Sequence, residues 1–357
     1  MKTDKNNLGV VLDIGTTNVV LNVYCIDNGE LIYSTEFKNP QVKVAADVMG
    51  RIAGAMKGRL REQQELILKA VGDAILESGY REKIKKWVIT GNTTMLYLLT
   101  GKDPTSMATF PFEADCLFDY SVPVLSGEAY LPKCLSAFVG ADITCGILDC
   151  GLCESSKVNL LVDIGTNAEM ALWKDGILYI TSAAAGPAFE RKKYKGSEMV
   201  DIISDMLRKG ILDKYGTFAD SISDDVLDKG ISLSQTDVRA VQLAKGAVAA
   251  GIKVLMEETG TGFDEIENFY IAGVFGEHLD IENAGFIGLI PKEMTALANK
   301  DKIRVIGNSA LNGAKKILLK NIKGDDAIFD FTSKTRPVLL GEHGRFNQYF
   351  IEEMNFE

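Results

Sequence analysis

Val10-Val11-Leu12-Asp13-Ile14-Gly15-Thr16-Thr17-Asn18 returns later in the chain as Leu160-Leu161-Val162-Asp163-Ile164-Gly165-Thr166-Asn167. Each copy is an apolar run that ends in Asp-Ile-Gly-Thr and is followed by an extended segment. A turn signal closes that segment, Asp27-Asn28-Gly29 in the first copy and Asp175-Gly176 in the second, and such turns favour β-hairpins. Two copies of one pattern about 150 residues apart predict two lobes of like fold.

Segments with helical periodicity lie between the predicted strands. The predicted helices cover residues 47–78, 136–148, 234–259 and 308–320, and further strands cover residues 87–92, 269–273 and 302–306. Gly79 is the predicted stop of the first of these helices, and Ser234 to Asp237 resembles a capping box that opens the third. Alternating strands and helices are typical of an α/β fold. We expect lobe I at residues 8–150, completed by the C-terminal segment 308–357, and lobe II at residues 151–307. No low-complexity linker separates the lobes, so they are expected to share a hinge.

The composition limits the class of protein. The chain has 357 residues, 46% apolar and 25% charged, with a net charge of −10. This composition argues against extensive disorder, and the lack of a dense basic run argues against a nucleic-acid partner. The apolar runs are shorter than the roughly 20 residues that span a bilayer, and the polar N-terminus does not resemble a signal peptide. We therefore expect a cytoplasmic protein without a membrane partner, whose six cysteines are thiols or metal ligands.

The first motif offers the groups that bind a metal-phosphate complex. Asp13 stands where a buried strand leaves the core, and a carboxylate there can orient Mg²⁺ directly or through water. Gly15 allows close approach of the backbone to a phosphate. Thr16, Thr17 and Asn18 continue the turn, with hydroxyl and N–H donors for phosphate oxygens. The structural alternative is a β-hairpin whose Asp and Thr side chains satisfy turn hydrogen bonds.

The second copy strengthens the binding hypothesis over that alternative. Gly165, Thr166 and Asn167 are expected to face the same phosphates as the first motif, from the opposite lobe. Asp163 is expected to share the metal-binding and catalytic role of Asp13.

Two further positions complete the predicted site. Gly273 and Gly276 follow a buried strand and would let the backbone lie against a base or ribose; alternatively they form a tight strand-to-helix turn. Asp142 is expected either to orient a water molecule that attacks the bound phosphate or to serve as a helix cap or interlobe hydrogen-bond partner.

In this order, the two Asp-Ile-Gly-Thr motifs and the Gly-x-Phe-Gly turn resemble the phosphate-1, phosphate-2 and adenosine motifs of the acetate and sugar kinase/Hsp70/actin superfamily. The segments Ser136–Leu148 and Asn308–Lys320 resemble its two connecting helices. The resemblance implies a two-lobed, actin-like ATPase of duplicated ribonuclease-H-like lobes, with ATP and Mg²⁺ in the cleft between the lobes. A small-molecule kinase of this superfamily is disfavoured, because no sugar-binding signature is visible.

Within that superfamily, the chain resembles the C-terminal ATPase domain of the reductive activators of corrinoid proteins. The strings that carry this resemblance include Gly91-Asn92-Thr93-Thr94-Met95, Ala137-Phe138-Val139-Gly140-Ala141-Asp142, Ala185-Gly186-Pro187-Ala188-Phe189-Glu190, Gly288-Leu289-Ile290-Pro291 and Gly307-Asn308-Ser309-Ala310-Leu311-Asn312-Gly313-Ala314. The resemblance implies a corrinoid protein as partner, whose cobalt is re-reduced from Co(II) to Co(I) with the help of ATP in a methyl-transfer system.

The sequence departs from that family in two respects. The ATPase motif begins at residue 10, whereas family members carry an N-terminal ferredoxin-like domain with a [2Fe–2S] cluster. We therefore expect a separate ferredoxin-like protein to donate the electron; the alternative is a truncated or repurposed relative of the family. The segment after Glu190 is shorter than is usual in the family, which puts ATP hydrolysis in doubt more than ATP binding. A non-hydrolysing, nucleotide-binding regulatory protein that docks on a corrinoid protein or methyltransferase is the main alternative.

Three cysteines have the spacing of a plant-type ferredoxin cluster. Cys145, Cys150 and Cys153 follow the C-x₄-C-x₂-C pattern, but no cysteine follows them as a fourth ligand, and only Cys134 could complete a site. We expect no iron–sulfur cluster, with Cys145 acting as a small buried side chain in a helix. The remaining alternative is an iron–sulfur ATPase activator of the 2-hydroxyacyl-CoA dehydratase type, which implies a homodimer.

Other polar residues have two interpretations each. Arg239, Gln242 and Lys245 are spaced by three on one predicted helix and are expected either to line the adenosine or to form a surface stripe. His278 and His343 are far apart in sequence and suggest neither a metal site nor a catalytic triad.

Overall fold

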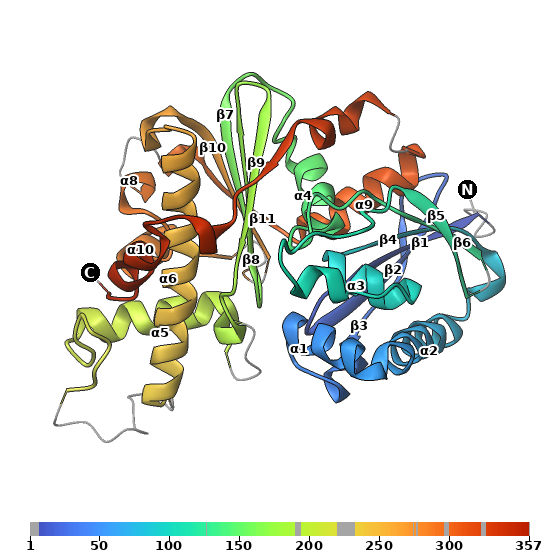
Figure 1. Cartoon of the computed structure of the whole chain (residues 1–357), viewed down its shortest axis with the longest axis horizontal. Helices are drawn as coiled ribbons and strands as arrows, with labels where there is room; N and C mark the ends of the chain where they lie inside the picture. The colour runs from blue at the N-terminus through green and yellow to red at the C-terminus, as the bar shows by residue number, and fades with distance from the viewer. Residues whose placement is uncertain are drawn as a thin grey trace. The chain divides into compact units, whose positions relative to one another are not determined.

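The computed structural model describes residues 7–125, 127–189, 194–219, 233–273, 275, 278–295, 300–322 and 326–356. It divides into two compact units (Figure 1). Unit 1 contains Met1–Gly151 and Ser309–Thr335, and unit 2 contains Leu152–Asn308 and Arg336–Glu357.

Unit 1 is built on a mixed sheet with strand order β3-β2-β1-β4-β6-β5. Its strands are β1 (Leu8–Ile14), β2 (Asn18–Cys25), β3 (Leu31–Lys38), β4 (Ile84–Gly91), β5 (Tyr120–Val124) and β6 (Gly127–Leu131). Strand β1 pairs antiparallel with β2 and parallel with β4. The side chains of β1 are almost continuously buried, as expected for a central strand covered on both faces.

The α-helices described in unit 1 are α1 (Val48–Gly54), α2 (Leu60–Ser78), α3 (Thr93–Thr100), α4 (Ala141–Cys150) and α9 (Ser309–Lys320). The predicted stop at Gly79 is confirmed, because this glycine ends α2 in the left-handed conformation. The predicted start of a helix at Ser136 is wrong. The Ser136 hydroxyl accepts the N–H groups of Phe138 and Val139 in a turn, so α4 begins only at Ala141.

Helices α4 and α9 pack against each other without side chains between their backbones at one point. A Cβ atom on Gly313 would overlap the carbonyl group of Cys145 and lie 2.7 Å from its Cα atom. Lys316 fastens the same pair of helices: its ammonium group lies 2.9 Å from the Asp149 carboxylate and donates to the Asp149 carbonyl at 2.7 Å.

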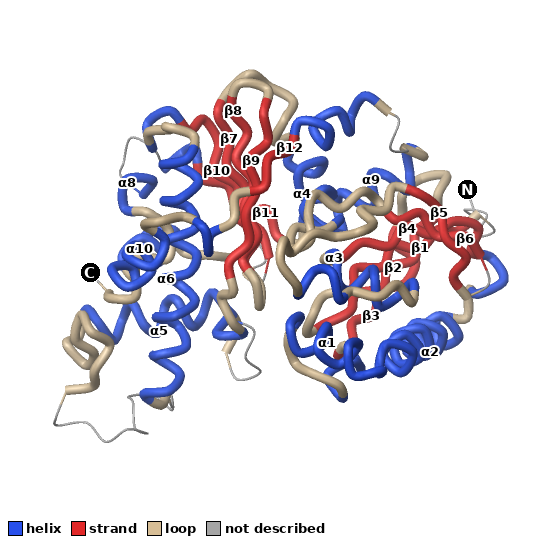
Figure 2. The backbone as a smooth tube through the Cα atoms, viewed as in Figure 1, coloured by secondary structure: helices blue, strands red, loops and turns tan. Residues whose placement is uncertain are grey.

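Unit 2 repeats the sheet of unit 1 with strand order β11-β10-β7-β8-β9-β12. Its strands are β7 (Val158–Ile164), β8 (Ala168–Lys174), β9 (Ile177–Ala183), β10 (Ile266–Gly273), β11 (Ile303–Gly307) and β12 (Thr335–Pro337). Strand β7 pairs antiparallel with β8 and parallel with β10, as β1 does with β2 and β4 (Figure 2). The predicted duplication of one α/β fold is therefore confirmed, and each motif strand occupies the same place in its own sheet.

The helices of unit 2 are α5 (Gly196–Arg208), α6 (Gln235–Glu258), α7 (Ile281–Phe286), α8 (Lys292–Thr295) and α10 (Phe346–Glu353). Ser234 and Asp237 form the predicted capping box at the start of α6. None of the helices in the described ranges is both long and apolar enough to cross a membrane.

The C-terminal segment packs on unit 2, which corrects the expectation that residues 308–357 return together to the first lobe. Helix α9 lies in unit 1, but residues 336–357 continue along β9 and α6. The fully buried Lys245 of α6 donates to the backbone carbonyls of Glu353 and Asn355. The C-terminal segment thus supplies the acceptors for a cation that α6 cannot satisfy alone.

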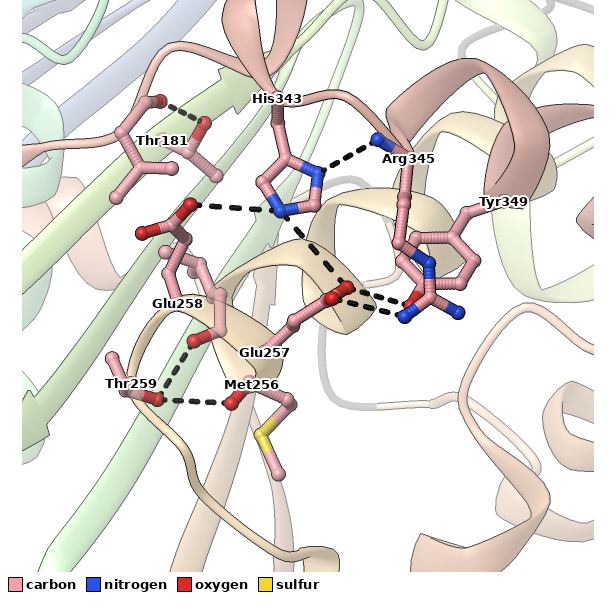
Figure 3. A network of polar contacts seen from close by, with 10 residues as sticks. Thr181, Met256, Glu257, Glu258, Thr259, His343, Arg345 and Tyr349 are labelled. Carbon is pink, nitrogen blue, oxygen red and sulfur yellow. Dashed lines mark hydrogen bonds and ion pairs between the residues drawn. The ribbon is translucent and has the colours of Figure 1, made fainter.

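A surface network reinforces this attachment (Figure 3). Glu257, near the end of α6, accepts hydrogen bonds from Arg345 at 2.9 Å and from the Tyr349 hydroxyl at 2.6 Å. The His343 ring lies 3.5 Å from the Glu258 carboxylate. His343 is therefore part of a contact between the C-terminal segment and the end of α6.

Candidate functional site

The first predicted loop lies where two parallel strands end. In the ladder of β1 and β4, Asp13 is opposite Thr90 and Ile14 is opposite Gly91. Gly91 has φ +150°, and a Cβ atom there would lie 2.6 Å from the Ile14 carbonyl oxygen. Gly15 is equally constrained, since its Cβ atom would lie 2.7 Å from the Asn18 carbonyl oxygen. The backbones therefore approach closely at the carboxyl edge of the sheet, where ligands bind in open α/β folds.

The carbonyl groups of this loop are held from inside unit 1. Asn39 donates from its side-chain amide to the Gly15 carbonyl at 2.8 Å, and Arg51 donates to the Thr16 carbonyl at 2.7 Å. In a planar trans peptide, the N–H of the next residue points opposite to the carbonyl. The N–H groups of Thr16 and Thr17 therefore point away from Asn39 and Arg51. Successive N–H groups turned to one side form a concavity that suits an anion.

Asn92 connects this loop to the start of α3. Its side-chain oxygen caps α3 by accepting the Met95 N–H at 3.0 Å, and its amide nitrogen donates to the Thr16 hydroxyl at 3.2 Å. Gly140, just before α4, has no room for a side chain, because a Cβ atom would overlap Asn92 and lie 2.5 Å from the Gly91 carbonyl oxygen. The loop, the end of β4 and the start of α4 therefore form one rigid corner.

Asp142 brings a second carboxylate to this corner. It lies in the first turn of α4 and is partly exposed, and its side chain accepts the Ile143 N–H at 2.8 Å. Burial raises the pKa of Asp142 from 3.8 to about 6, against the lowering effect of backbone hydrogen bonds from Ile143 and Gly140. The Asp142 side chain thus accepts an N–H within the first turn of α4, whose N-cap residue is Gly140, and a carboxyl group with a pKa near neutrality also suits proton transfer.

Asp13 and Asp142 act on the same buried thiol. Burial raises the pKa of Cys145, and the negative charges of Asp142 and Asp13 add to that rise. Both carboxylates therefore lie within electrostatic reach of one side chain in α4. Unit 1 thus gathers Asp13, Asp142 and the Thr16 loop, although these residues are far apart in sequence.

The second predicted loop has its own hydrogen bonds in unit 2. The N–H of Gly165 donates to the Asn167 carbonyl at 2.8 Å, and the N–H of Gly186 donates to the Thr166 carbonyl at 2.7 Å. Gly273, at the end of β10, has φ +97°, and a Cβ atom there would overlap the Ile164 carbonyl and lie 2.6 Å from a carboxylate oxygen of Asp163. Gly273 thus stands against Ile164 as Gly91 stands against Ile14, which supports a tight-turn role for this glycine. Gly276 lies outside the described residues.

Three polar residues of α6 have structural partners, and two of them, Gln242 and Lys245, are buried, so these residues do not form the expected surface stripe. Arg239 donates to the Tyr215 carbonyl and to the Gln242 side chain, each at 2.6 Å, and Gln242 donates to the same carbonyl at 3.0 Å. Lys245 is fully buried and is occupied by the C-terminal carbonyls. These side chains hold unit 2 together.

The cysteines show no cluster arrangement in the described part of the chain. Cys145 is fully buried in α4, as predicted, and the Cys150 thiol lies 3.8 Å from the Ile147 carbonyl oxygen. No three His, Cys, Asp or Glu side chains among the described residues are grouped to hold a metal ion. The start of the segment that the sequence suggests is shortened, residues 190–193, lies outside the described ranges.

Unit 1 also contains a cavity of about 600 Å³ at the other end of β4. Its charged lining consists of Lys85, Lys86, Asp119 and Glu128, so the two signs balance. This balance gives no preference for an anion, in contrast to the corner around Thr16.

Sequence reasoning missed Arg51 and Asn39 as supports of the first loop. Arg51 is the one charged residue in the helix segment Val48–Gly54, and it is fully buried. An arginine within an otherwise uncharged stretch of helix was the signal that could have identified it.

Comparisons with known proteins agree with this architecture. Residues 8–155 match the family described as the RACo middle region, and residues 157–196 and 192–357 match the C-terminal domain of RACo, the ASKHA domain. A solved structure, "Reductive activator for corrinoid,iron-sulfur protein", superposes with a TM-score of 0.90 at 25% identity over 99% of this chain and 67% of its own.

Two relatives are similar in sequence. The "Corrinoid activation enzyme RamQ" of Eubacterium limosum is 30% identical over 394 residues, which cover 88% of this chain and 65% of RamQ. This chain therefore spans less than two thirds of that relative. The "[Co(II) methylated amine-specific corrinoid protein] reductase" of Methanosarcina barkeri is 21% identical over 421 residues, which cover 98% of this chain and 77% of the reductase.

The duplicated sheets and these matches agree in assigning the actin-like fold, and the chain belongs to the RACo family, of which it contains the middle region and the C-terminal ASKHA domain.

Proposed function

We propose that this chain binds Mg-ATP through the loops that follow β1 and β7. The residues proposed to contact the phosphates are Gly15, Thr16, Thr17, Asn18, Gly165, Thr166 and Asn167. Asp13 and Asp163 would hold Mg²⁺, since carboxylate oxygens are the ligands that this ion prefers. Asp142 would orient the attacking water, and Gly273 and Gly276 would lie beside the adenosine.

The first loop fits such a ligand because of its backbone. The Gly15 and Thr16 carbonyls are taken up by Asn39 and Arg51, which turns the following N–H groups to the other side. Phosphate oxygens accept hydrogen bonds, and N–H groups that face away from the core can donate to them. Bound Mg²⁺ would neutralise part of the phosphate charge, and the nearby carboxylate of Asp13 has the chemistry to hold it.

The proposed activity is ATP-dependent reductive activation of a corrinoid protein. The observation that carries this proposal is the superposition, over 99% of the chain, on a structure titled as a reductive activator for a corrinoid, iron–sulfur protein. The names of RamQ and of the methylamine-system reductase point to the same chemistry.

In this reaction one electron passes from a reduced ferredoxin-like iron–sulfur protein to the corrinoid cobalt. The donor cluster is oxidised by one electron, and Co(II) becomes Co(I). We propose that the donor is a separate protein and that the partner is the corrinoid protein of a methyl-transfer system. ATP can assist only as far as its affinity differs between the conformations of the activator.

The test is an anaerobic assay with this chain, a corrinoid protein in the Co(II) state and a reduced ferredoxin, with and without Mg-ATP. The visible spectrum reports the loss of Co(II) and the rise of Co(I). We expect ATP-dependent formation of Co(I) with wild type and a large loss with Asp13→Ala. Asp73→Ala is the matched control, because Asp73 is exposed on α2 and forms an ion pair with Lys69 on the same helix.

The same samples distinguish the regulatory alternative by their ATP turnover. ATP binding without hydrolysis and without Co(I) formation would identify a nucleotide-sensing protein. Formation of Co(I) that is independent of ATP, or equal activity in Asp13→Ala and wild type, would contradict the proposed role of the first loop.

A further inference from the structure

Arg51 is a buried cation directly behind the first loop. Its side chain is fully buried and donates to the carbonyls of Thr16 and Ala45, at 2.7 and 3.1 Å. One guanidinium nitrogen also lies 3.4 Å from the Gln41 side-chain oxygen and 2.9 Å from the Met95 sulfur. All four partners are neutral. Within the described ranges, no carboxylate forms an ion pair with this guanidinium.

This arrangement is unfavourable for the isolated protein. Burial lowers the pKa of Arg51 from 12.5 to about 10, and the charge of Asp47, the cap of α1, only partly opposes that effect. A pKa of about 10 still leaves the guanidinium protonated at neutral pH. A buried charge without a counter-ion is costly, and apolar residues often replace buried ionic groups without loss of stability. The positive charge is therefore better explained by a ligand than by the packing of α1.

We propose that Arg51 is a positioning residue for the phosphates of the nucleotide. Its guanidinium holds the Thr16 carbonyl inward, and its uncompensated charge makes the loop from Gly15 to Thr17 attractive to a polyphosphate. This inference rests on the proposed function, because it assumes that the loop binds ATP.

Two features of the structure connect the charge to the loop. The bond to the Thr16 carbonyl turns the N–H of Thr17 to the opposite side of the peptide plane. The guanidinium lies on the opposite side of the Thr16–Thr17 peptide from that N–H. It is buried there, so water screens its electric field only weakly. The N–H donors of the loop and the positive charge of Arg51 therefore favour an anion on the same side of the loop before a ligand binds. Preorganised anion sites gain affinity in this way.

The alternative is that Arg51 only joins α1 to the loop after β1. A joint of that kind would affect every ligand, and the fold itself, to the same degree. A charge effect instead grows with the number of phosphates, because each added phosphate brings more negative charge within reach. Adenosine, which has no phosphate, should not respond to the charge.

The experiment measures binding of ATP, ADP, AMP and adenosine by calorimetry, with Mg²⁺ present, for wild type, Arg51→Met and Arg51→Lys. Arg51→Met should weaken ATP binding by tenfold or more, ADP and AMP progressively less, and adenosine by less than twofold. Arg51→Lys keeps the charge and should keep the ATP-over-adenosine preference within about threefold of wild type. Arg59→Met removes a positive charge from an exposed ion pair with Glu62 and should change no affinity.

Each result has a defined meaning. Equal loss for all four ligands in Arg51→Met, or wild-type affinity for ATP, overturns the inference. If Arg51→Met does not fold, Arg51→Lys decides alone, because loss of the ATP-over-adenosine preference with the charge retained also overturns it. Wild-type protein that binds no nucleotide refutes the proposed function and this inference with it. Wild-type binding with an unchanged Arg51→Met affects this inference alone.

Discussion

The close contact between α4 and α9 makes Gly313→Ala a severe substitution. In an ordinary helix interior, replacing glycine by alanine stabilises by about 1 kcal/mol. Here the new Cβ atom would lie 2.7 Å from the Cα atom of Cys145 and overlap its carbonyl, whereas ordinary contacts begin at 3.4 Å. Backbone atoms cannot rotate out of the way, so the helices must part by roughly an ångström, and overpacking of this kind costs about 3 kcal/mol. We expect a net loss of about 2 kcal/mol.

The assay is urea unfolding followed by circular dichroism, with Gly72→Ala as the matched control. Gly72 lies inside α2, and its Cβ atom would find its nearest neighbour, a Leu125 methyl group, at an ordinary 3.6 Å. This control should gain up to about 1 kcal/mol. The two glycine-to-alanine changes should therefore move the unfolding midpoint in opposite directions. A Gly313→Ala protein as stable as wild type would refute the reasoning, because it would mean that the helices can separate at no cost.

Two further predictions concern buried charge. Lys245→Met should lower the free energy of unfolding in urea by about 2 kcal/mol and expose the C-terminal segment to proteases, because the carbonyls of Glu353 and Asn355 lose their donor. The control, Glu257→Ala in the surface network, should shift the unfolding midpoint far less. Equal shifts in the two variants would contradict the role given to Lys245. In nucleotide-free protein, Asp142→Asn should raise stability at pH 8. The raised pKa of Asp142 means that the folded state binds more protons than the unfolded state between pH 3.8 and about 6, so wild-type stability falls as the pH rises through that window. The advantage of Asp142→Asn should be at most about 3 kcal/mol, reduced by partial solvent exposure, and should vanish below pH 4; the same advantage at every pH would exclude this carboxyl group as its cause.

The sequence was most informative where the structure depends on local patterns. The apolar runs before Asp13 and Asp163 predicted two buried strands, and the later hairpin signals predicted the antiparallel pairs β2–β3 and β8–β9. The capping box at Ser234 and the stop at Gly79 were also visible, because helix ends depend on residues a few positions apart.

The rest depended on partners that are distant in sequence. Lys245 appeared to belong to a polar stripe because its acceptors lie more than 100 residues away, in the C-terminal segment. Arg51 could not be connected with Thr16 before α1 had been placed beside the loop that follows β1. Ser136 could begin either a helix or a turn, and only its bonds to Phe138 and Val139 decide between them.

The division of the chain has a consequence for its synthesis. The sheet of unit 1 is complete by Leu131, but α9, which covers β1 and packs on α4, begins only at Ser309. At translation rates of about 5–20 residues per second, the ribosome needs roughly 9–36 s to synthesise the residues between Leu131 and Ser309. During this time Gly9, which receives the Leu318 side chain in the finished protein, has no cover from α9. The nascent first unit therefore passes through a period in which a chaperone, or the ribosome surface itself, has to shield one face of its sheet.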